Sequence, residues 1–404
     1  MARTLPTTSV QIGWSTTTTG GFTIGASTIG GAHVLTGKFG PSGFTFTDVT
    51  SEVKEARGRR GRSDSLGRMH EGTCRLILKD TTGRYNPNNA SSPLAGSLRP
   101  GRPVRVRDTH LGVEYGLFYG VIRTLEARPA RGEREAVLDC VDLFDWLRAS
   151  NPVIAATGPT TVGAAIGLVL DAIDFDGGSA RALDTGSSVP DFSADGDTSA
   201  LGLIEGLLAA DLGVFFVSGD GVATYHGRDR RFQPGATVAT LSGSALSRIY
   251  PRVSLDQIKN RARVTREGGA QQEANDATSQ GIYGVRDEAP LTTPYLVDDQ
   301  AAANLASFLV ALQRDPSDPA RELEVPNRDD ASIALQLGLE LGDRVTVAEA
   351  LSGTSFEGTI EGVAWEKWGG ARFHRTTFTV GRRALADFFV VGSSAVGGTN
   401  VIGY

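Results

Sequence analysis

The chain has 404 residues, a formal net charge of −6 and 40% hydrophobic residues, which is enough for two or three domains with cores of their own. Its two cysteines exclude a disulfide framework, and its longest apolar runs are too short to span a bilayer. The first residues run straight into Thr and Ser without the pattern of a signal peptide. We therefore expect a protein that is made in the cytoplasm and has no membrane-spanning segment.

The N-terminal third divides into an arm and a β-domain. Residues 1–45 are rich in Thr, Gly and Ser, which predicts an extended arm with a glycine-rich docking motif. Residues 46–150 contain short runs of β-branched residues separated by Gly and Pro turns, which predicts an antiparallel β-barrel. Its strands are expected at 73–79, 104–106, 117–125 and 135–141, and a short helix near 143–148 closes the block.

The next block has a different pattern. Residues 151–245 are expected to form an acidic α+β insertion, because 151–227 hold ten acidic residues and one basic residue. Helices are predicted at 164–173 and 200–210, followed by a hairpin whose turn contains Asp220-Gly221. Residues 51–110, in contrast, hold 13 Lys and Arg against 6 Asp and Glu. Opposed charges of this kind suit contacts between subunits, or they simply mark solvated loops.

From residue 246 the strand pattern returns and predicts a second β-barrel over 246–386. Its strands are expected at 261–265, 322–325, 344–347, 358–365 and 373–380, with one helix at 298–312. Residues 387–404 are predicted to form a C-terminal docking strand. The fold class that follows is mainly β, with two barrels, an inserted helix-and-hairpin domain and extended termini.

An internal repeat carries the prediction of two barrels. Each copy has a turn glycine, an outgoing strand, a loop, and a returning strand with a glycine in its middle, as a barrel corner requires. Chance similarity between two hairpins is the alternative, but the agreement in order and spacing favours two copies of one barrel. The barrel-defining residues are Gly101, Val104, Phe118, Gly120 and Ile122 in the first copy, and Gly342, Val345, Phe356, Gly358 and Ile360 in the second.

A second repeat links the two ends of the chain. Residues 22–35 and 389–402 are identical at six of fourteen positions. A strand, a Gly-Gly turn and another short strand cannot bury a core alone, so each copy is expected to dock on the chain's own barrel or on a neighbour. For the C-terminal copy we expect strand addition to a neighbouring subunit. The candidate docking residues are Phe22, Gly25, Ser27, Gly30, Gly31 and Val34, and Phe389, Gly392, Ser394, Gly397, Gly398 and Val401.

Motifs for chemistry are missing from the sequence. The five histidines are scattered, and there is no HExxH motif, nucleophile elbow, Walker loop or dinucleotide fingerprint. The acidic turn 191–197 is reminiscent of a calcium loop, but Gly202 stands where an EF-hand needs Glu. The basic run 57–62 is expected to be a solvated or subunit-facing loop, with phosphate contact as the alternative. We expect no catalytic residues, no metal and no cofactor, although carboxylates that converge in space to cleave glycosides remain an open alternative.

Several segments resemble a known family. Residues 48–53 (DVTSEV), 71–80 (EGTCRLILKD) and 83–87 (GRYNP) resemble the opening of minor tail proteins of long-tailed bacteriophages of high-GC bacteria. The segment from 199 through LGVFFV at 212–217 is similar to the helix and hairpin of tail hub proteins. NRARV at 260–264 and LGDRV at 341–345 resemble their later barrel, so the resemblance covers about residues 46–385.

The resemblance implies a structural role in the virion. Tail hubs are rings whose barrels resemble the tail-tube subunit, so two barrels in one protomer let a homotrimer imitate a sixfold ring. The chain would then adapt the sixfold tube to the threefold tip, after assembly in the host cytoplasm. The expected partners are the distal tail ring, tip or fibre proteins and the tape-measure protein, with DNA only in transit during ejection. A channel wall of acidic or mixed charge is expected, because fixed cations would hold DNA.

Two other functions remain open at this stage. A sixfold distal tail ring protein would share the barrel but use one copy per protomer. A carbohydrate-binding tail protein would expose aromatic platforms, whereas at least two of the four tryptophans (Trp14, Trp146, Trp365 and Trp368) fall within predicted core elements.

Overall fold

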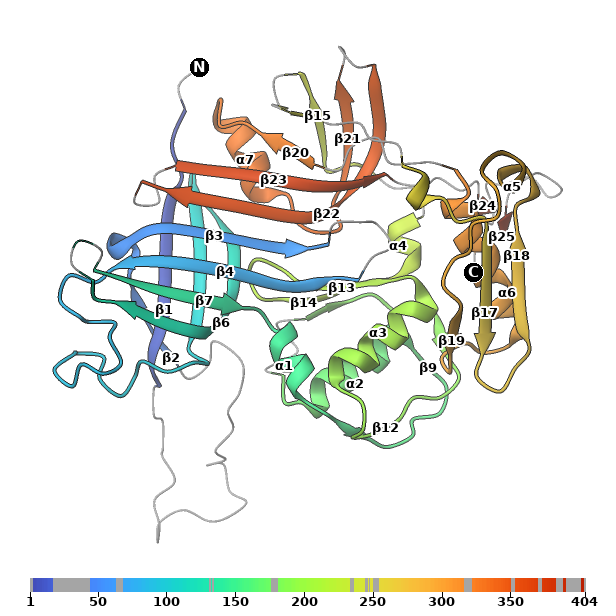
Figure 1. Ribbon diagram of the computed structural model, residues 1–404, viewed down its shortest axis with the longest axis horizontal. Helices are drawn as coiled ribbons and strands as arrows, with labels where there is room; N and C mark the ends of the chain where they lie inside the picture. Colours follow the sequence, from blue (N-terminus) through green and yellow to red (C-terminus); the bar gives the residue numbers. More distant parts are fainter. Residues whose placement is uncertain are drawn as a thin grey trace, which may run out of the picture.

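The computed structural model describes residues 3–16, 44–62, 68–130, 132, 134–175, 181–232, 236–243, 246, 248–249, 254–315, 322–349, 353–369, 373–382, 388–389 and 401–402. The prediction of a mainly β protein is confirmed (Figure 1). No helix in these residues is long and apolar enough to cross a membrane.

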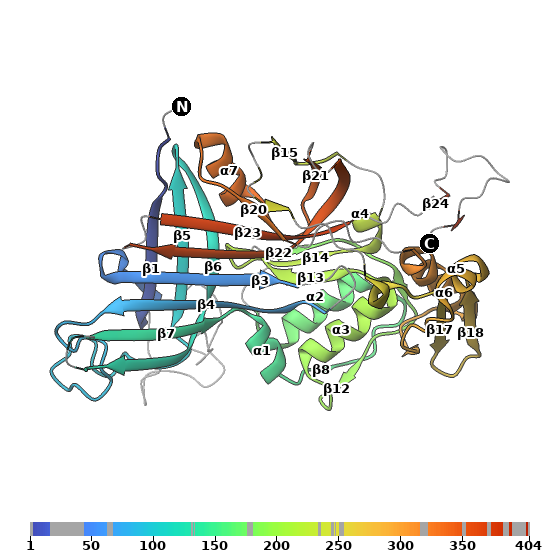
Figure 2. The ribbon, with the colours of Figure 1, turned by 45° about the horizontal axis from the view of Figure 1, so that its top comes forward.

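The largest sheet among the described residues has thirteen strands, and its main path runs in the order β16-β20-β23-β22-β3-β4-β7-β6-β5-β1-β2, with β21 on β22 and β15 on β21. The sheet combines strands from both ends of the chain, and in Figure 2 strands β1 and β5 run across the direction of β3, β4 and β22. Its strands are β1 (Thr7–Thr16), β2 (Phe44–Asp48), β3 (Val53–Gly61), β4 (His70–Lys79), β5 (Pro103–His110), β6 (Val113–Arg128), β7 (Glu135–Val141), β15 (Ala239–Ser242), β16 (Arg248–Ile249), β20 (Glu322–Val325), β21 (Arg344–Glu349), β22 (Thr354–Trp368) and β23 (Phe373–Arg382).

The N-terminal segment differs from the predicted arm. Residues 7–16 are strand β1, which pairs with β5 on one side and β2 on the other. Val10, Ile12 and Trp14 alternate with more polar residues and are buried in the core of the first half of the sheet. The alternation of apolar residues is therefore a strand signal that the Thr-rich composition obscured.

The basic run also differs from its prediction. Residues 57–61 lie in strand β3, between β4 and β22, and do not form a loop. Glycine and arginine have little intrinsic preference for strands, so the pairing with two neighbours that lie far away in the sequence outweighs local propensity here.

The repeated hairpins have the same backbone pairing. Val104 lies opposite Gly120 in β5–β6, and Val345 lies opposite Gly358 in β21–β22. Gly101 and Gly342 both adopt left-handed backbone, with φ of 81° and 84°. The N–H of Gly101 donates to the Ile122 carbonyl at 2.7 Å, and that of Gly342 donates to the Ile360 carbonyl at 2.8 Å. The repeat is thus one of backbone geometry as well as sequence, while the count of two separate barrels stays a prediction.

The inserted region contains helices and a hairpin over a core of its own. Helices α2 and α3 begin after Thr161 and Ser199, whose hydroxyls accept hydrogen bonds from backbone N–H groups of the first turn. Its elements are α1 (Phe144–Ala149), β8 (Val153–Ile154), β9 (Thr160–Thr161), α2 (Val162–Ala172), β10 (Arg181–Leu183), β11 (Ser188–Val189), β12 (Ala194–Asp195), α3 (Ala200–Asp211), β13 (Val214–Val217), β14 (Ala223–His226) and α4 (Arg228–Phe232).

Residues 254–313 differ most from the predicted second barrel. They form a separate three-stranded sheet, β18-β17-β19, that lies beside the inserted region and away from the large sheet (Figures 1 and 2). The predicted helix packs its Ala302 and Leu305 on Ala262 and Val264 of this small sheet, because these residues share one core. The elements are β17 (Arg261–Arg266), β18 (Gln271–Asn275), α5 (Ala277–Tyr283), β19 (Leu291–Thr293) and α6 (Asp299–Gln313).

Helix α7 and two short strands lie toward the C-terminal end of the chain. Helix α7 (Asp330–Gly338) was not predicted, and its Ile333 and Leu337 extend the core of the first half of the sheet. Strands β24 (Phe388–Phe389) and β25 (Val401–Ile402) pair in parallel, so the predicted docking residues Phe389 and Val401 lie in strands. The other candidate docking residues, from Phe22 to Val34 and from Gly392 to Gly398, lie outside the described residues.

Close packing at one glycine of β3 can be tested. A Cβ atom on Gly58 would lie 2.6 Å from Cζ2 of Trp365, which is buried opposite it on β22. Gly58→Ala should therefore lower the free energy of unfolding by about 1–3 kcal/mol, measured by urea denaturation. The matched control is Gly281→Ala in α5, where a Cβ meets nothing within 4 Å. An equal effect of the two substitutions would contradict the packing argument.

Candidate functional site: the sheet junction, its open face and the adjoining cleft

Strands β3 and β22 join the two halves of the large sheet. They pair antiparallel from Ala56 opposite Lys367 to Gly61 opposite Gly362. The N–H of Arg62 continues this ladder by donating to the Glu361 carbonyl at 2.7 Å. Backbone hydrogen bonds therefore make one continuous sheet from segments about three hundred residues apart.

Buried charges reinforce this junction. Arg62 donates from Nε to Glu361 Oε2 at 2.7 Å, and both side chains are about 5% exposed. Arg231 of α4 lies 3.8 Å from the other oxygen of the same carboxylate. Burial and the nearby charge of Arg62 lower the pKa of Arg231 to about 10, so its guanidinium stays charged at neutral pH. Glu361 thus connects the second half of the sheet to the first half and to the inserted region.

Arg60 makes a second connection from β3. Its guanidinium donates to the Leu117 and Val217 carbonyls at 3.2 Å each, and to the Glu340 carboxylate at 2.7 Å. These acceptors come from β6, β13 and the turn before β21. Sequence reasoning missed this role, although the spacing of Arg60 and Arg62 places both on one face of a strand.

His226 ties the inserted hairpin to the second repeat. Its ring packs edge-on against Phe216 with centroids 5.1 Å apart, and it adjoins Gly342 so closely that a Cβ there would lie 2.4 Å from Nδ1. Burial, with a contribution from the charge of Arg230, lowers the pKa of His226 to about 4. The imidazole is therefore neutral at physiological pH.

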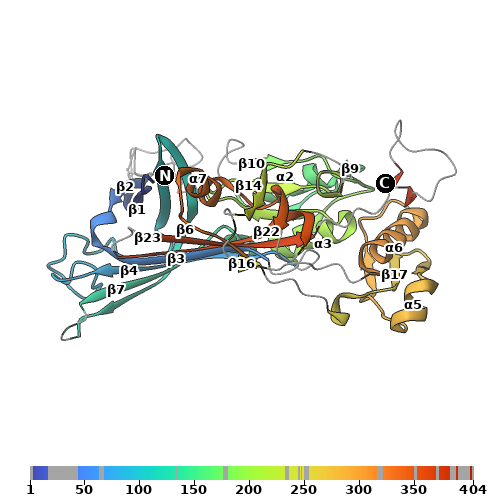
Figure 3. The same ribbon diagram turned by 90° about the horizontal axis from the view of Figure 1, so that it is seen from above.

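One face of the sheet carries a row of charged side chains. Arg375, Glu366, Arg57, Arg75 and Asp139 lie in register across β23, β22, β3, β4 and β7. The first three are exposed and the last two are half-buried. In Figure 3, β3, β22 and β23 are seen nearly edge-on, with α7, β1 and β6 on the other side. We call the face that carries this row of charged side chains the open face. Its charges are mixed in sign.

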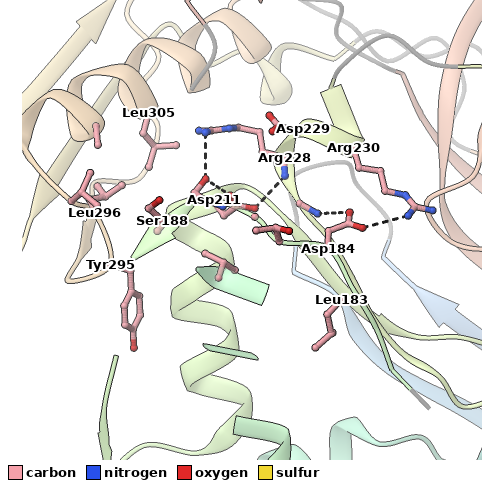
Figure 4. Close-up of a pocket in the computed structure, with 18 residues that line it drawn as sticks. Leu183, Asp184, Ser188, Asp211, Arg228, Asp229, Arg230, Tyr295, Leu296 and Leu305 are labelled. Carbon is pink, nitrogen blue, oxygen red and sulfur yellow. Dashed lines mark hydrogen bonds and ion pairs between the residues drawn. The ribbon is translucent and has the colours of Figure 1, made fainter. Parts of the chain in front are cut away.

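A cleft lies between the inserted region and the small sheet. It has a volume of about 850 Å³, and Leu183, Asp184 and Arg230 from one side face Tyr295 and Leu305 from the other (Figure 4). Both apolar and charged side chains line it.

Asp211 lines this cleft, and its carboxylate is occupied by hydrogen bonds within the protein. Its carboxylate accepts hydrogen bonds from the Ser187 N–H at 2.9 Å, the Ser187 hydroxyl, the Tyr225 hydroxyl and the Arg228 N–H at 3.2 Å. Burial and the charge of Asp211 raise the pKa of Tyr225, which therefore remains a donor. The Ser187 hydroxyl thus donates to this carboxylate, and no histidine is among the residues that line the cleft.

The site residues that the sequence predicts lie in different parts of the fold and do not form one site. The barrel-defining glycines Gly120 and Gly358 lie in equivalent places of the two hairpins. In the acidic turn, Asp191 accepts from the Gly158 N–H and Asp195 from the Asp197 N–H, as ordinary turn carboxylates do. Within the part of the chain that the structure describes, no group of three or more potential metal-ligating residues is found.

Comparison with solved structures finds this fold in phage tail proteins. A tail protein from Neisseria meningitidis superposes with a TM-score of 0.58 at 13% identity, covering 84% of this chain and 94% of that protein. The 43 kDa tail protein of prophage MuSo2 from Shewanella oneidensis gives a TM-score of 0.55 at 13% identity, with 84% and 95% covered. No family model and no curated protein sequence matches the chain. The predicted resemblance to tail proteins is therefore confirmed at the level of the fold.

The buried carboxylate at the junction can be tested by neutralising it. Glu361→Gln removes the charge that two buried guanidinium groups face, so the free energy of unfolding should fall by about 3–5 kcal/mol. Glu126→Gln, which weakens an exposed pair with Arg128 in one strand, is the matched control and should change it by at most about 1 kcal/mol. Chemical denaturation of both variants distinguishes them, and a small effect of Glu361→Gln would show that the junction does not depend on this charge.

The neutral state of His226 predicts an acid dependence. Its folded pKa of about 4 lies below the ordinary value of 6.5, so its contribution to stability is complete above pH 6.5 and is lost as the pH falls toward 4. We expect a loss of about 1.4 kcal/mol per pH unit in this window. His226→Gln should have a shallower slope of stability against pH, measured by denaturation from pH 7 to pH 4.5. Equal slopes of stability against pH for the wild-type protein and His226→Gln would rule out this contribution of His226.

Proposed function

We propose that this chain is a structural subunit of a phage tail-tip hub, with no catalytic role. In this proposal three copies form a ring, and each supplies two equivalent hairpins, so that the ring offers six similar positions to the sixfold tail tube. Such a subunit belongs to the virion, at the tip of the tail. Rotation by a threefold axis closes a ring of this kind through heterologous contacts.

The observation that carries the proposal is the shared register of the two hairpins. β5–β6 and β21–β22 both place a valine opposite the mid-strand glycine and, two residues further on, a valine opposite a phenylalanine, and both have a left-handed turn glycine. Both hairpins lie in one sheet, so a single protomer holds two similar modules in a fixed relation. The likeness to phage tail proteins over most of the chain supports this use of the fold.

The open face is our candidate for the channel wall. Its row holds three arginines and two carboxylates, and Arg59 lies exposed in the same strand as Arg57. Mixed charge suits a passage for DNA, because phosphates are neither held by counterion release nor strongly repelled. The core and α7 occupy the other side of this part of the sheet, which leaves the open face available to line a passage.

The two ends of the chain are our candidates for docking on neighbours. β24 and β25 make a parallel pair that has no third strand among the described residues and is too small to be stable alone, so it suits strand addition to a neighbour. The partners proposed for such contacts are adjacent copies, the distal tail ring, and tip or fibre proteins.

The alternatives fit the structure less well. A sixfold distal ring with one module per protomer leaves the second hairpin without a role. Carbohydrate binding through aromatic platforms loses two of its four candidate tryptophans, because Trp14 and Trp365 are buried at 2% and 1% exposure.

The number of copies of this chain in each tail tip tests the proposal. Native mass spectrometry of the tip complex, released from assembled tails, should give three copies of this chain for each tip. Six copies would favour the distal ring, and one copy would exclude a ring built from this chain.

A further inference from the structure

A lysine and an aspartate form a fully buried pair between the two halves of the sheet. Lys367 of β22 lies with Nζ 2.5 Å from Oδ2 of Asp108 in β5, and neither side chain is exposed. The two residues are 259 positions apart in the chain, and β3, β4, β7 and β6 lie between their strands in the sheet. The sheet therefore curls until β5 faces β22, and this pair lies where the two meet.

The surroundings of the pair favour neutral groups. Lys367 points away from the open face, since its neighbours Glu366 and Trp368 are exposed there. Trp365, in the same strand as Lys367, belongs to the apolar core of the first half of the sheet. Ala56 lies opposite Lys367 on β3. Burial lowers the pKa of the Lys367 ammonium despite the charge of Asp108. Taking two charges out of water costs several kcal/mol per ion unless hydrogen bonds compensate.

Compensation is incomplete at this site. Asp108 Oδ1 is buried and has no hydrogen-bond partner among the described residues. His374 lies opposite Lys367 in the β22–β23 register, and its pKa is lowered to about 3 by burial and by the Lys367 charge, so it contributes no countercharge. The pair therefore lacks the hydrogen bonds that would offset the burial of two charges.

We infer that Lys367 and Asp108 condense to an isopeptide bond that links β22 to β5 covalently. Nζ gives up a proton and attacks Cγ of Asp108, a C–N bond forms, and one Cγ–O bond breaks. That oxygen leaves as one water molecule with the two protons that the Lys367 ammonium loses, so no oxidant or other reactant is needed. An oxygen at 2.5 Å from Nζ places its carbon at about 3–3.5 Å, which is the range of a near-attack conformer.

The amide would resolve the electrostatic problem of the site. It is neutral, its formation releases one water, and it joins the first repeat to the second across the interior of the curled sheet. This inference holds whatever the copy number of the ring, because both residues belong to one protomer.

The mass of the intact, denatured wild-type protein tests the cross-link. We expect a mass lower than that of the sequence by one water. A tryptic digest should contain a branched peptide that joins residues 108–123 to residues 345–372, because trypsin cannot cleave at a modified Lys367. Lys54, which pairs with Glu135 at the surface with 41% of its side chain exposed, is the internal control and should stay unlinked.

Two variants complete the experiment, and neither needs to fold for its mass to be read. Lys367→Met and Asp108→Ala should each have the full mass of their own sequence. A wild-type protein of full sequence mass would overturn the inference, and so would a loss of water that persists in either variant.

Discussion

The pairing of β3 with β22 is the constraint on which the rest of the structure depends. It joins residues 53–61 to residues 354–368 and so makes one sheet out of both ends of the chain. Its register is narrowly fixed, because Trp365 lies over Gly58 and Glu361 must meet Arg62. A shift by one residue would turn Arg60 and Arg62 to the open face and bury Arg57 and Arg59 without partners.

This constraint has a direct consequence for assembly. Arg60, Glu361 and His226 each contact more than one region, so the two halves of the sheet and the inserted region are held as one packed unit. Two hairpins of the same register are then presented in a fixed relation by every protomer. The proposed ring would need such rigidity, since the error in each contact accumulates around a closed ring.

Much of this architecture could be predicted from the sequence. The periodic segments around 73–79, 135–141 and 373–380 are strands, the apolar spacing at 298–312 is a helix, and the repeat of Gly101 and Gly342 has matching backbone geometry.

What could not be predicted depends on distant partners. β1 has a clear alternation, but its Thr-rich composition is equally typical of an arm. Arg60 and Arg62 are compatible with burial only because Glu340 and Glu361 lie beside them, and nothing near them in the sequence shows this. Residues 254–313 have the same strand rhythm as a barrel, and only the apolar face of α6 decides that they form a unit of their own.

The most direct test of this account is a cryo-EM map of the assembled tail tip at side-chain resolution. The account predicts three copies of this chain, with the β5–β6 and β21–β22 hairpins alternating around a ring at six similar positions and the open face turned toward its axis. A ring in which only one hairpin of each protomer takes part, or one in which the open face is turned outward, would contradict it.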